Sequence, residues 1–197
     1  MISSLQENID LALFTTLSIG GPARYFTQAS SENTVLDAID FARRKGLPVF
    51  VLGGGTNLLV SDAGFPGLVL QVAIRHSSIA ESDGSAIVRA GAGVDWDPLV
   101  AECVEKNLAG IECLSGVPGW VGGTPVQNVA AYGQEVGRVI SRVRAYDRRS
   151  ASVVELSRAE CSFTYRTSVF NTTACDRYIV LEVEYELEPG GTPTVAY

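Results

Sequence analysis

The first third of the chain alternates between short apolar runs and one stretch of helical periodicity. Residues 22–29 have the composition of a strand. The serines at positions 30 and 31 then offer N-caps to a helix in which apolar side chains recur three and four positions apart and cations occupy the last turn. Gly46 and Pro48 end this helix, and the apolar run 49–52 follows as a buried strand. The pattern predicts a small α/β unit of strand, helix and strand.

Strand patterns dominate the rest of the chain. Residues 68–72 and 86–90 are predicted strands, and Asp95 is expected to cap a helix. Two further strands, 139–146 and 151–156, flank a four-residue segment that suits a hairpin loop. Few helices among many strands indicate an α+β fold.

The clearest strand spans residues 178–188, where apolar side chains alternate with Glu182, Glu184, Glu186 and Glu188. Because successive side chains of a strand point to opposite faces, one face is expected in the core and the acidic face in water. We therefore expect no metal at these carboxylates. A polar stretch near residues 75–83 is the expected boundary between a small N-terminal α/β subdomain, residues 1–75, and a larger mixed-sheet subdomain, residues 76–197.

Composition limits the kinds of partner. The 197 residues carry a formal charge of −7, with 46% hydrophobic and 19% charged residues, which is typical of a folded protein. The acidic balance disfavours nucleic acid and anionic membranes as partners. No spanning segment or leader is recognisable, so a cytoplasmic protein is expected. Four widely spaced cysteines and one histidine predict buried or free thiols and no zinc centre.

Eight of the 20 glycines lie in two clusters that could carry chemistry. The first, Gly-Gly-Gly-Thr-Asn-Leu at 53–58, directly follows the predicted strand 49–52. Consecutive small residues let backbone N–H groups converge on an anion, so this loop could hold a pyrophosphate. It is neither a P-loop nor a dinucleotide fingerprint, because no Gly-Lys-Ser/Thr follows and Leu58 replaces the last glycine. An ordinary glycine-rich turn is an equally open interpretation.

The second cluster, residues 115–135, is long, rich in glycine and without periodicity. Trp120, Tyr132 and several valines argue against disorder, so a functional loop is expected. Backbone groups freed from regular pairing could bond the edge of a flat heterocycle. A third segment, 163–168, places Arg166 between aromatic residues and hydroxyls. Arg166 is either a surface arginine whose stem packs on a ring or a planar fork for a substrate carboxylate.

These segments, in this order and spacing, resemble the bacterial UDP-N-acetylenolpyruvoylglucosamine reductase family, the UDP-N-acetylmuramate dehydrogenases. The resemblance runs from about Phe14 to Tyr197. It rests on 53–58, on Ser-Gly-Val-Pro-Gly at 115–119 with the later motif Ala-Tyr-Gly-Gln-Glu at 131–135, and on Tyr-Arg-Thr-Ser at 165–168. The segment Thr-Thr-Leu-Ser-Ile-Gly-Gly at 15–21 also resembles the family's opening.

The resemblance implies a flavoenzyme of peptidoglycan synthesis, and hence of cell-wall biogenesis, cell shape and cell division. Such an enzyme binds FAD non-covalently, takes hydride from NADPH and reduces UDP-N-acetylglucosamine enolpyruvate to UDP-N-acetylmuramate. The implied fold is the vanillyl-alcohol-oxidase or PCMH-type FAD-binding fold, and the two subdomains would both bind FAD. Arg166 would be catalytic, stabilising the negative charge that develops on the enolpyruvyl carboxylate.

Motif positions assign further residues. Substrate contacts are implied for Tyr132, Tyr165, Arg166 and Tyr197, and no metal is implied. The residues implied to contact FAD are Gly53, Gly54, Gly55, Thr56, Asn57, Leu58, Ser115, Gly116, Val117, Pro118, Gly119, Gly122, Gly123, Thr124, Gln127, Asn128, Ala131, Tyr132 and Gly133.

The sequence departs from the family at its end. Members continue past a tyrosine like Tyr197 into a third, substrate-binding domain that supplies the proton donor, and that domain is expected to be absent here. The chain alone is therefore expected to be catalytically incomplete. Thr56 and Ala130 stand where Ser and Gly are common. Two alternatives stay open: another flavin oxidoreductase of the same fold, and a flavin-binding module without catalysis.

Overall fold

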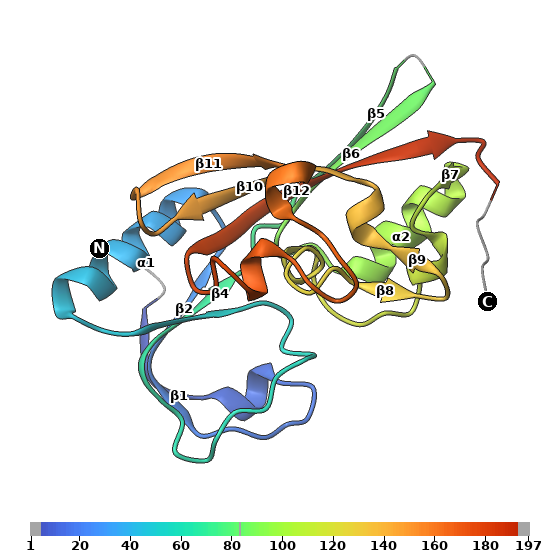
Figure 1. Ribbon diagram of the computed structural model, residues 1–197. Coiled ribbons are helices and arrows are strands. Elements are labelled where there is room, and N and C mark those ends of the chain that lie inside the picture. Colours follow the sequence, from blue (N-terminus) through green and yellow to red (C-terminus); the bar gives the residue numbers. More distant parts are fainter. Residues whose placement is uncertain (1–4, 83, 193–197) are drawn as a thin grey trace. The chain divides into compact units, whose positions relative to one another are not determined.

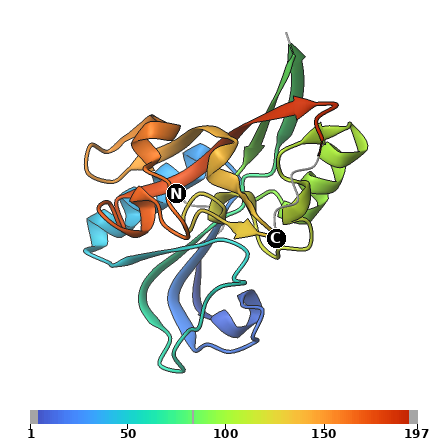
Figure 2. The same ribbon diagram turned by 45° about the vertical axis from the view of Figure 1, so that its right-hand side comes forward.

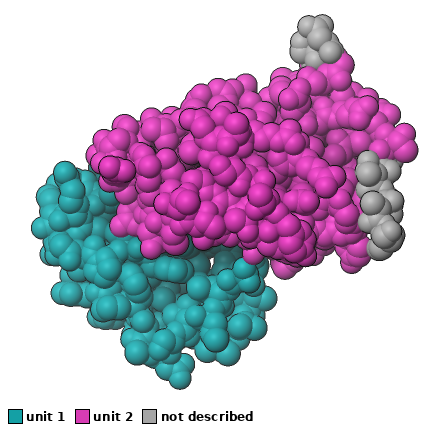
Figure 3. All heavy atoms as spheres, in the orientation of Figure 1, with its two compact units in different colours: residues 1–74 teal, residues 75–197 magenta. Residues whose placement is uncertain are grey.

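The computed structural model describes residues 5–82 and 84–192, and the chain divides into two compact units, residues 1–74 and 75–197 (Figures 1 and 3). Each unit has its own sheet. Figure 2 shows the same elements from a second direction.

Unit 1 is built on a four-stranded sheet in the order β1-β2-β4-β3. Its strands are β1 (Gln6–Asp10), β2 (Pro22–Ala29), β3 (Val49–Leu52) and β4 (Phe65–Val72). β2 and β3 both run parallel to β4, and β1 is antiparallel to β2. The helix α1 (Glu32–Lys45) connects β2 to β3, so the predicted strand, helix and strand are confirmed.

The ends of α1 follow from two residues. The Ser31 hydroxyl accepts a hydrogen bond from the Thr34 amide, and Gly46 takes a left-handed conformation with φ of 62° while its N–H bonds back to the last turn. A hydrophobic core lies under the sheet of this unit, with a short 3₁₀ helix, η1 (Leu11–Phe14), contributing its first residue. The fully packed members are Leu11, Ala23, Phe26, Leu52 and Val69.

Unit 2 is built on a long antiparallel sheet in the order β11-β10-β12-β6-β5. Its strands are β5 (Ser77–Ser82), β6 (Ser85–Gly91), β10 (Ile140–Asp147), β11 (Ser152–Ser157) and β12 (Tyr178–Pro189), and the two-residue β7 (Leu108–Ala109) pairs with the end of β12. Every described pair in this sheet is antiparallel. The mixed sheet, which we expected in the larger unit, is the sheet of unit 1.

The sequence pattern does not predict two of the strands, β1 and β5. β5 occupies most of the polar stretch near the expected boundary, and β1 lies in the first part of the chain, where no strand was predicted. Both are edge strands, and four of the five residues of β1 are exposed. An edge strand with little buried surface needs no apolar face, so its sequence carries no alternation to detect.

The helix α2 (Trp96–Glu105) follows β6 and begins after Asp95, as predicted. Asp95 occupies the N-cap position, but its carboxylate pairs with Arg75 at 2.8 Å and makes no capping bond to the backbone. After α2 come the short helices η2 (Glu112–Leu114), η3 (Val121–Gly123) and η4 (Val136–Arg138), the helices α3 (Arg158–Cys161) and η5 (Val169–Asn171), and the hairpin of β8 (Ala130–Ala131) with β9 (Gln134–Glu135).

Candidate functional site

The loop 53–58 in unit 1 leaves β3 and is held by backbone bonds to the segment after η1. The Thr16 amide donates to the Gly55 carbonyl at 3.0 Å. Gly55 has φ of 67°, and a Cβ there would fall inside the contact distance of the Phe14 carbonyl oxygen. Only glycine fits at position 55. The side-chain amide of Gln71 donates to the Gly53 carbonyl at 3.2 Å, which fixes the start of the loop to β4.

The other positions of this loop differ in what surrounds them. Apart from its chain neighbours, no atom of the described residues lies within 4 Å of where a Cβ would stand on Gly53, so the backbone there is open on that side. Asn57 is exposed, while Thr56 and Gly54 are half-buried. Leu58 packs against the core of unit 1 and anchors the end of the loop. An open glycine between two fixed points is what a backbone cradle for an anion requires.

The first part of the second loop is fastened to the start of α2. One carboxylate oxygen of Asp97 accepts from the Gly116 amide at 2.6 Å and from the Ser115 hydroxyl at 2.9 Å. The Gly116 amide, followed by the Ser115 hydroxyl, holds the pKa of Asp97 below its usual value. Trp96 donates its backbone N–H to the Gly119 carbonyl and its indole N–H to the Leu114 carbonyl, both at 3.0 Å. The loop is thus ordered on both sides of Val117 and Pro118.

The middle of the loop packs against β6 and β12. The Gly122 amide donates to the Ala92 carbonyl at 2.9 Å, and a Cβ on Gly122 would stand 2.7 Å from the Ala92 Cβ. The Thr124 hydroxyl is buried, donates to the Val121 carbonyl and bonds the Tyr185 hydroxyl at 2.9 Å. Burial raises the pKa of Tyr185. By contrast, Gly116 and Gly123 have no protein atom within 4 Å of a Cβ position.

The loop ends in a hairpin whose tip is Tyr132-Gly133, between β8 and β9. Both tip residues have positive φ, 49° and 84°, as in a two-residue type I′ turn. The Tyr132 ring is 59% exposed. Ala131 is half-buried at the base of the tip.

A second tight turn presents Tyr165 and Arg166. The amides and carbonyls of Thr164 and Thr167 bond each other at 3.0 and 2.9 Å, which leaves two residues at the tip. Arg166 has φ of 55°, and its carbonyl accepts from the Asn171 side chain at 3.2 Å. Arg166 is exposed and Tyr165 is 74% exposed, so both side chains are accessible.

Buried side chains bring this turn and the second loop together within unit 2. The Asn128 side chain donates to the Thr164 carbonyl at 2.8 Å, and the Ser168 hydroxyl donates to the Val126 carbonyl at 2.6 Å. Ser168 is fully buried, and its hydroxyl also accepts from the Phe170 amide. Two segments some forty residues apart therefore form one structure around Arg166.

Three residues of that structure, Asn128, Tyr132 and Arg166, hold left-handed backbone conformations. Such conformations are common for glycine and tolerated by asparagine, but costly for tyrosine and arginine. Strained positions of this kind concentrate at functional sites, because a specific side chain is needed there. A cavity of about 720 Å³ lies beside the turn and is lined by Asn128, Glu135, Arg138, Arg158, Phe163 and Tyr165, among others.

Comparison with known proteins shows the family to which the chain belongs. The model of the FAD binding domain family matches residues 23–157, which is more than half of the chain. The chain belongs to the FAD binding domain family. The matched residues contain the loop 53–58 and the whole of the loop 115–133. Arg166 lies just beyond them.

Two curated relatives of the chain share the same name. The chain is 46% identical over 188 residues to the UDP-N-acetylenolpyruvoylglucosamine reductase of Thermobifida fusca, covering 95% of this chain and 52% of the relative. It is 47% identical over 178 residues to that of Streptomyces coelicolor, covering 90% and 45%. The chain thus spans about half the length of these relatives and corresponds to the FAD-binding portion of this type of reductase, whose members use FAD.

Solved structures agree on the FAD-binding fold. The UDP-N-acetylenolpyruvylglucosamine reductase of Thermus caldophilus superposes with a TM-score of 0.73 at 27% identity, covering 93% of this chain and 62% of that one. A solvent-stable cholesterol oxidase superposes with a TM-score of 0.66 at 17% identity, covering 94% and 38%. The second likeness shows the fold alone. The predicted α+β FAD-binding fold is confirmed.

The described residues fit FAD in two respects. Gly53, Gly116 and Gly123 present open backbone, so a phosphate or a ring can approach where no side chain intervenes. The two exposed tips carry an aromatic residue and a guanidinium that a ligand can reach. Leu58 and Thr124, which we expected to contact FAD, instead direct their side chains into the protein. Any contact from the buried Thr124 must come from its backbone, whereas Leu58 is only half-buried.

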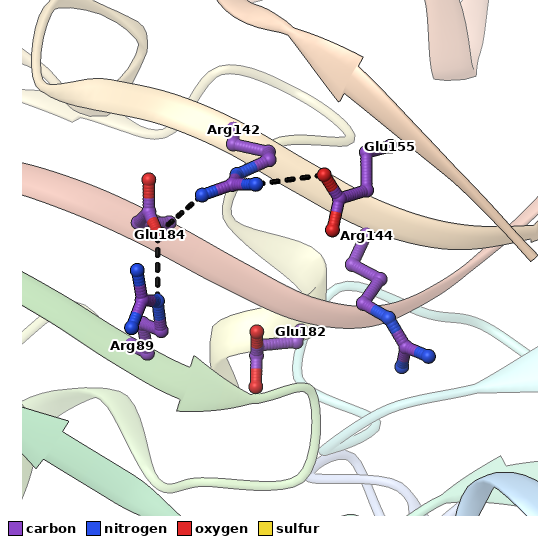
Figure 4. Close-up of a pocket in the computed structure, with 6 residues that line it drawn as sticks. All are labelled: Arg89, Arg142, Arg144, Glu155, Glu182 and Glu184. Atoms are coloured by element: carbon purple, nitrogen blue, oxygen red, sulfur yellow. Dashed lines mark hydrogen bonds and ion pairs between the residues drawn. The ribbon is translucent and has the colours of Figure 1, made fainter.

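A second cluster of charged side chains, on β6, β10, β11 and β12, is a set of ion pairs around a cavity of about 180 Å³ (Figure 4). Glu184 is only 8% exposed and contacts Arg89 at 2.7 Å and Arg142 at 3.0 Å. Burial alone would raise the pKa of Glu184, but bonds from Ser141, Arg89 and Arg142 outweigh it and hold the pKa below its usual value. The prediction that the acidic face of β12 lies in water is wrong at Glu184.

The residues whose hydrogen bonds and packing fix the loops could not be recognised from the sequence. Asp97, Gln71 and Gly137 carry no motif, and Ser168 was noted only as part of the Tyr-Arg-Thr-Ser match. The one available signal was the position of Asp97 in the first turn of a predicted helix that precedes a glycine-rich loop. Tyr197, a predicted substrate residue, lies outside the described residues. Among the helices of the described ranges, none is long and apolar enough to cross a membrane.

Proposed function

We propose that this chain binds FAD for the NADPH-dependent reduction of UDP-N-acetylglucosamine enolpyruvate to UDP-N-acetylmuramate. The relatives of known description, at up to 47% identity over most of the chain, support this reaction. The observation that carries the proposal is the Arg166 turn. A guanidinium is held at a strained, exposed tip that is bonded to the loop proposed to line the flavin.

The two loops take different parts of the cofactor in this proposal. Residues 53–58 hold the pyrophosphate through backbone N–H groups, and the open parts of residues 115–133 contact the flavin. The two compact units are then the two FAD-binding subdomains. When bound, FAD supplies the hydride chemistry, and the chain supplies position and electrostatics.

Arg166 binds the substrate carboxylate in this proposal. Hydride arrives at the β carbon of the enolpyruvyl group, and negative charge develops on the α carbon and its carboxylate. A planar guanidinium forms two parallel hydrogen bonds to a carboxylate and stabilises that charge as it grows. Tyr132 and Tyr165, each exposed at the tip of its own turn, contact the rest of the substrate in this proposal.

The test is a spectral titration with UDP-N-acetylglucosamine enolpyruvate of the FAD-loaded chain joined to the third, substrate-binding domain that members of the family carry. The wild-type chain should show a saturable change in the flavin spectrum, and Arg166→Lys should weaken the apparent affinity at least tenfold, because lysine cannot form the bidentate pair. Arg148→Lys is the matched control, since Arg148 lies on the β10–β11 turn and bonds the Asp176 carbonyl. Equal affinities for wild type and Arg166→Lys would refute the role of Arg166.

A further inference from the structure

We propose that Asn128 is a positioning residue that holds the Arg166 turn in place, and that its side chain does not bind the cofactor. The inference rests on the proposed function, because it takes Arg166 as the carboxylate-binding group. Motif position had assigned Asn128 to FAD, and its surroundings in unit 2 support a different role.

The first step is that the side chain of Asn128 has no hydrogen-bonding capacity left for a ligand's donors and acceptors. Its Nδ2 donates one hydrogen to the Thr164 carbonyl and the other to Glu135 Oε2, both at 2.8 Å. Its Oδ1 accepts from the Gly137 amide at 2.8 Å. A primary amide has two N–H donors, and both are used. Asn128 borders the cavity beside the turn, but with only 1% of the residue exposed, little of the remaining lone pair of Oδ1 is open to a ligand.

The second step is that the orientation of this amide is fixed by its partners. A carbonyl and a carboxylate require the NH₂ group, and a backbone N–H requires the oxygen, so the flipped amide would place like against like at all three contacts. Gly137 packs closely against this amide, because a Cβ at position 137 would stand 2.7 Å from Asn128 Oδ1 and 2.7 Å from the ring of Phe163.

The third step connects Asn128 to Arg166. The Thr164 carbonyl accepts from Asn128 and also from the Thr167 amide, the bond that closes the turn. Asn128, in the loop 115–135, therefore bonds the same carbonyl oxygen that closes the turn. Because Arg166 occupies a left-handed conformation that costs energy, the turn needs such external bonds to persist.

The substitution Asn128→Asp tests this at nearly constant volume. It keeps the acceptor for Gly137 but replaces the donor with an oxygen that faces the Thr164 carbonyl and Glu135. Amide hydrogen exchange of Thr164 and Thr167 at pH 8 should lose at least tenfold in protection. FAD affinity should stay within threefold of wild type, and affinity for the enolpyruvyl substrate should fall at least tenfold.

A pH dependence separates positioning from general destabilisation. Burial beside Glu135 raises the pKa of the introduced carboxyl, so at pH 5 it is protonated and can again donate to the Thr164 carbonyl. Protection relative to wild type should recover there. Asp147→Asn, a reverse exchange at a buried ion pair on β10, is the matched control. It destabilises the fold away from the turn, so the protection of Thr164 and Thr167 should fall by less in this variant than in Asn128→Asp at pH 8, and should not recover at pH 5. If Asn128→Asp does not fold, Asn128→Gly keeps the left-handed backbone and removes the side chain.

Two results would overturn the inference. One is unchanged protection of Thr164 and Thr167 in both variants. The other is a tenfold or larger loss of FAD affinity with that protection retained, which would make Asn128 a cofactor ligand. A wild-type chain that binds no FAD would refute the proposed function instead, and the exchange measurement would still decide whether Asn128 holds the turn.

Discussion

Arg166 occupies a backbone conformation that glycine would adopt at lower cost, and this combination separates its function from the stability of the chain. A left-handed conformation costs an L-residue about 1–2 kcal/mol. The Asn171 side chain bonds the Arg166 carbonyl, which any residue at that position would keep. We therefore expect the arginine side chain at this position to serve ligand binding and not the stability of the fold.

We predict that Arg166→Gly leaves the free energy of unfolding unchanged or raises it by up to about 1 kcal/mol, because relief of strain exceeds the added freedom of the unfolded chain. The same variant should lose the substrate-induced change in the flavin spectrum. Urea denaturation and the spectral titration measure the two effects. A loss of more than about 1 kcal/mol would mean that the guanidinium is a structural group.

Two glycines of the first loop form a natural pair for testing the cofactor cradle. Gly55→Ala should lower the free energy of unfolding of unit 1 by at least about 2 kcal/mol, because the position has positive φ and no room beside the Phe14 carbonyl. Gly53→Ala should leave stability within about 1 kcal/mol of wild type, because the space beside it is open. It should nevertheless weaken FAD binding at least tenfold, since the new methyl group enters the cradle. Retained FAD affinity in Gly53→Ala would contradict the cradle.

The sequence predicts residues well where chemistry and local pattern coincide. The glycine loops and the Arg166 segment were found from their composition and from the family resemblance. The roles of Asn128 and Thr124 could not be found in this way, because each depends on atoms that lie far away in the sequence, at Thr164 and Tyr185. A motif by itself does not distinguish a residue that contacts a ligand from a residue that positions another, ligand-contacting residue.

At the level of elements, local signals were sufficient where a helix or strand has its own caps and a buried face. The helix α1 was predicted with Ser30 or Ser31 as its N-cap and with its terminal Gly46, and the structure selects Ser31. The edge strands β1 and β5 were missed because pairing with a neighbour, not their own pattern, makes them strands. Glu184 on β12 was misassigned for a related reason. Its burial comes from Arg89 on β6 and Arg142 on β10, which the alternation within one strand cannot reveal.

The turn between β10 and β11 provides a prediction about pH. Asp147 is buried, and bonds to both Arg177 Nε and Nη2, at 3.0 and 2.7 Å, hold its pKa well below the usual range. Because the folded-state pKa is lowered, this pair stabilises the protein above the unfolded-state pKa of about 3.9, and the stabilisation is lost as the pH falls toward the folded-state value.

We predict that Asp147→Asn lowers the free energy of unfolding at pH 7 by about 1–3 kcal/mol, the range for a hydrogen bond to a charged group. The variant should also lose less stability than wild type between pH 5 and pH 3. Urea titrations across this range measure both values. A pH profile parallel to that of wild type would show that another carboxylate dominates the acid response.

At the level of the whole molecule, the chain consists of two compact units, each with its own sheet and core, and one predicted loop system lies in each. The family match covers parts of both units. The net negative charge disfavours nucleic acid and anionic membranes as partners, but an acidic protein can still bind a small anionic ligand through individual groups. Backbone N–H groups and single arginines are such groups and need no cationic surface.

The central claim is that this chain binds FAD through contacts to both the pyrophosphate and the flavin. The most direct measurement is a calorimetric titration of the flavin-free chain with FAD and, separately, with FMN, which lacks the pyrophosphate. The account predicts one FAD per chain and at least tenfold weaker binding of FMN. No uptake of FAD, or equal affinity for FAD and FMN, would contradict it.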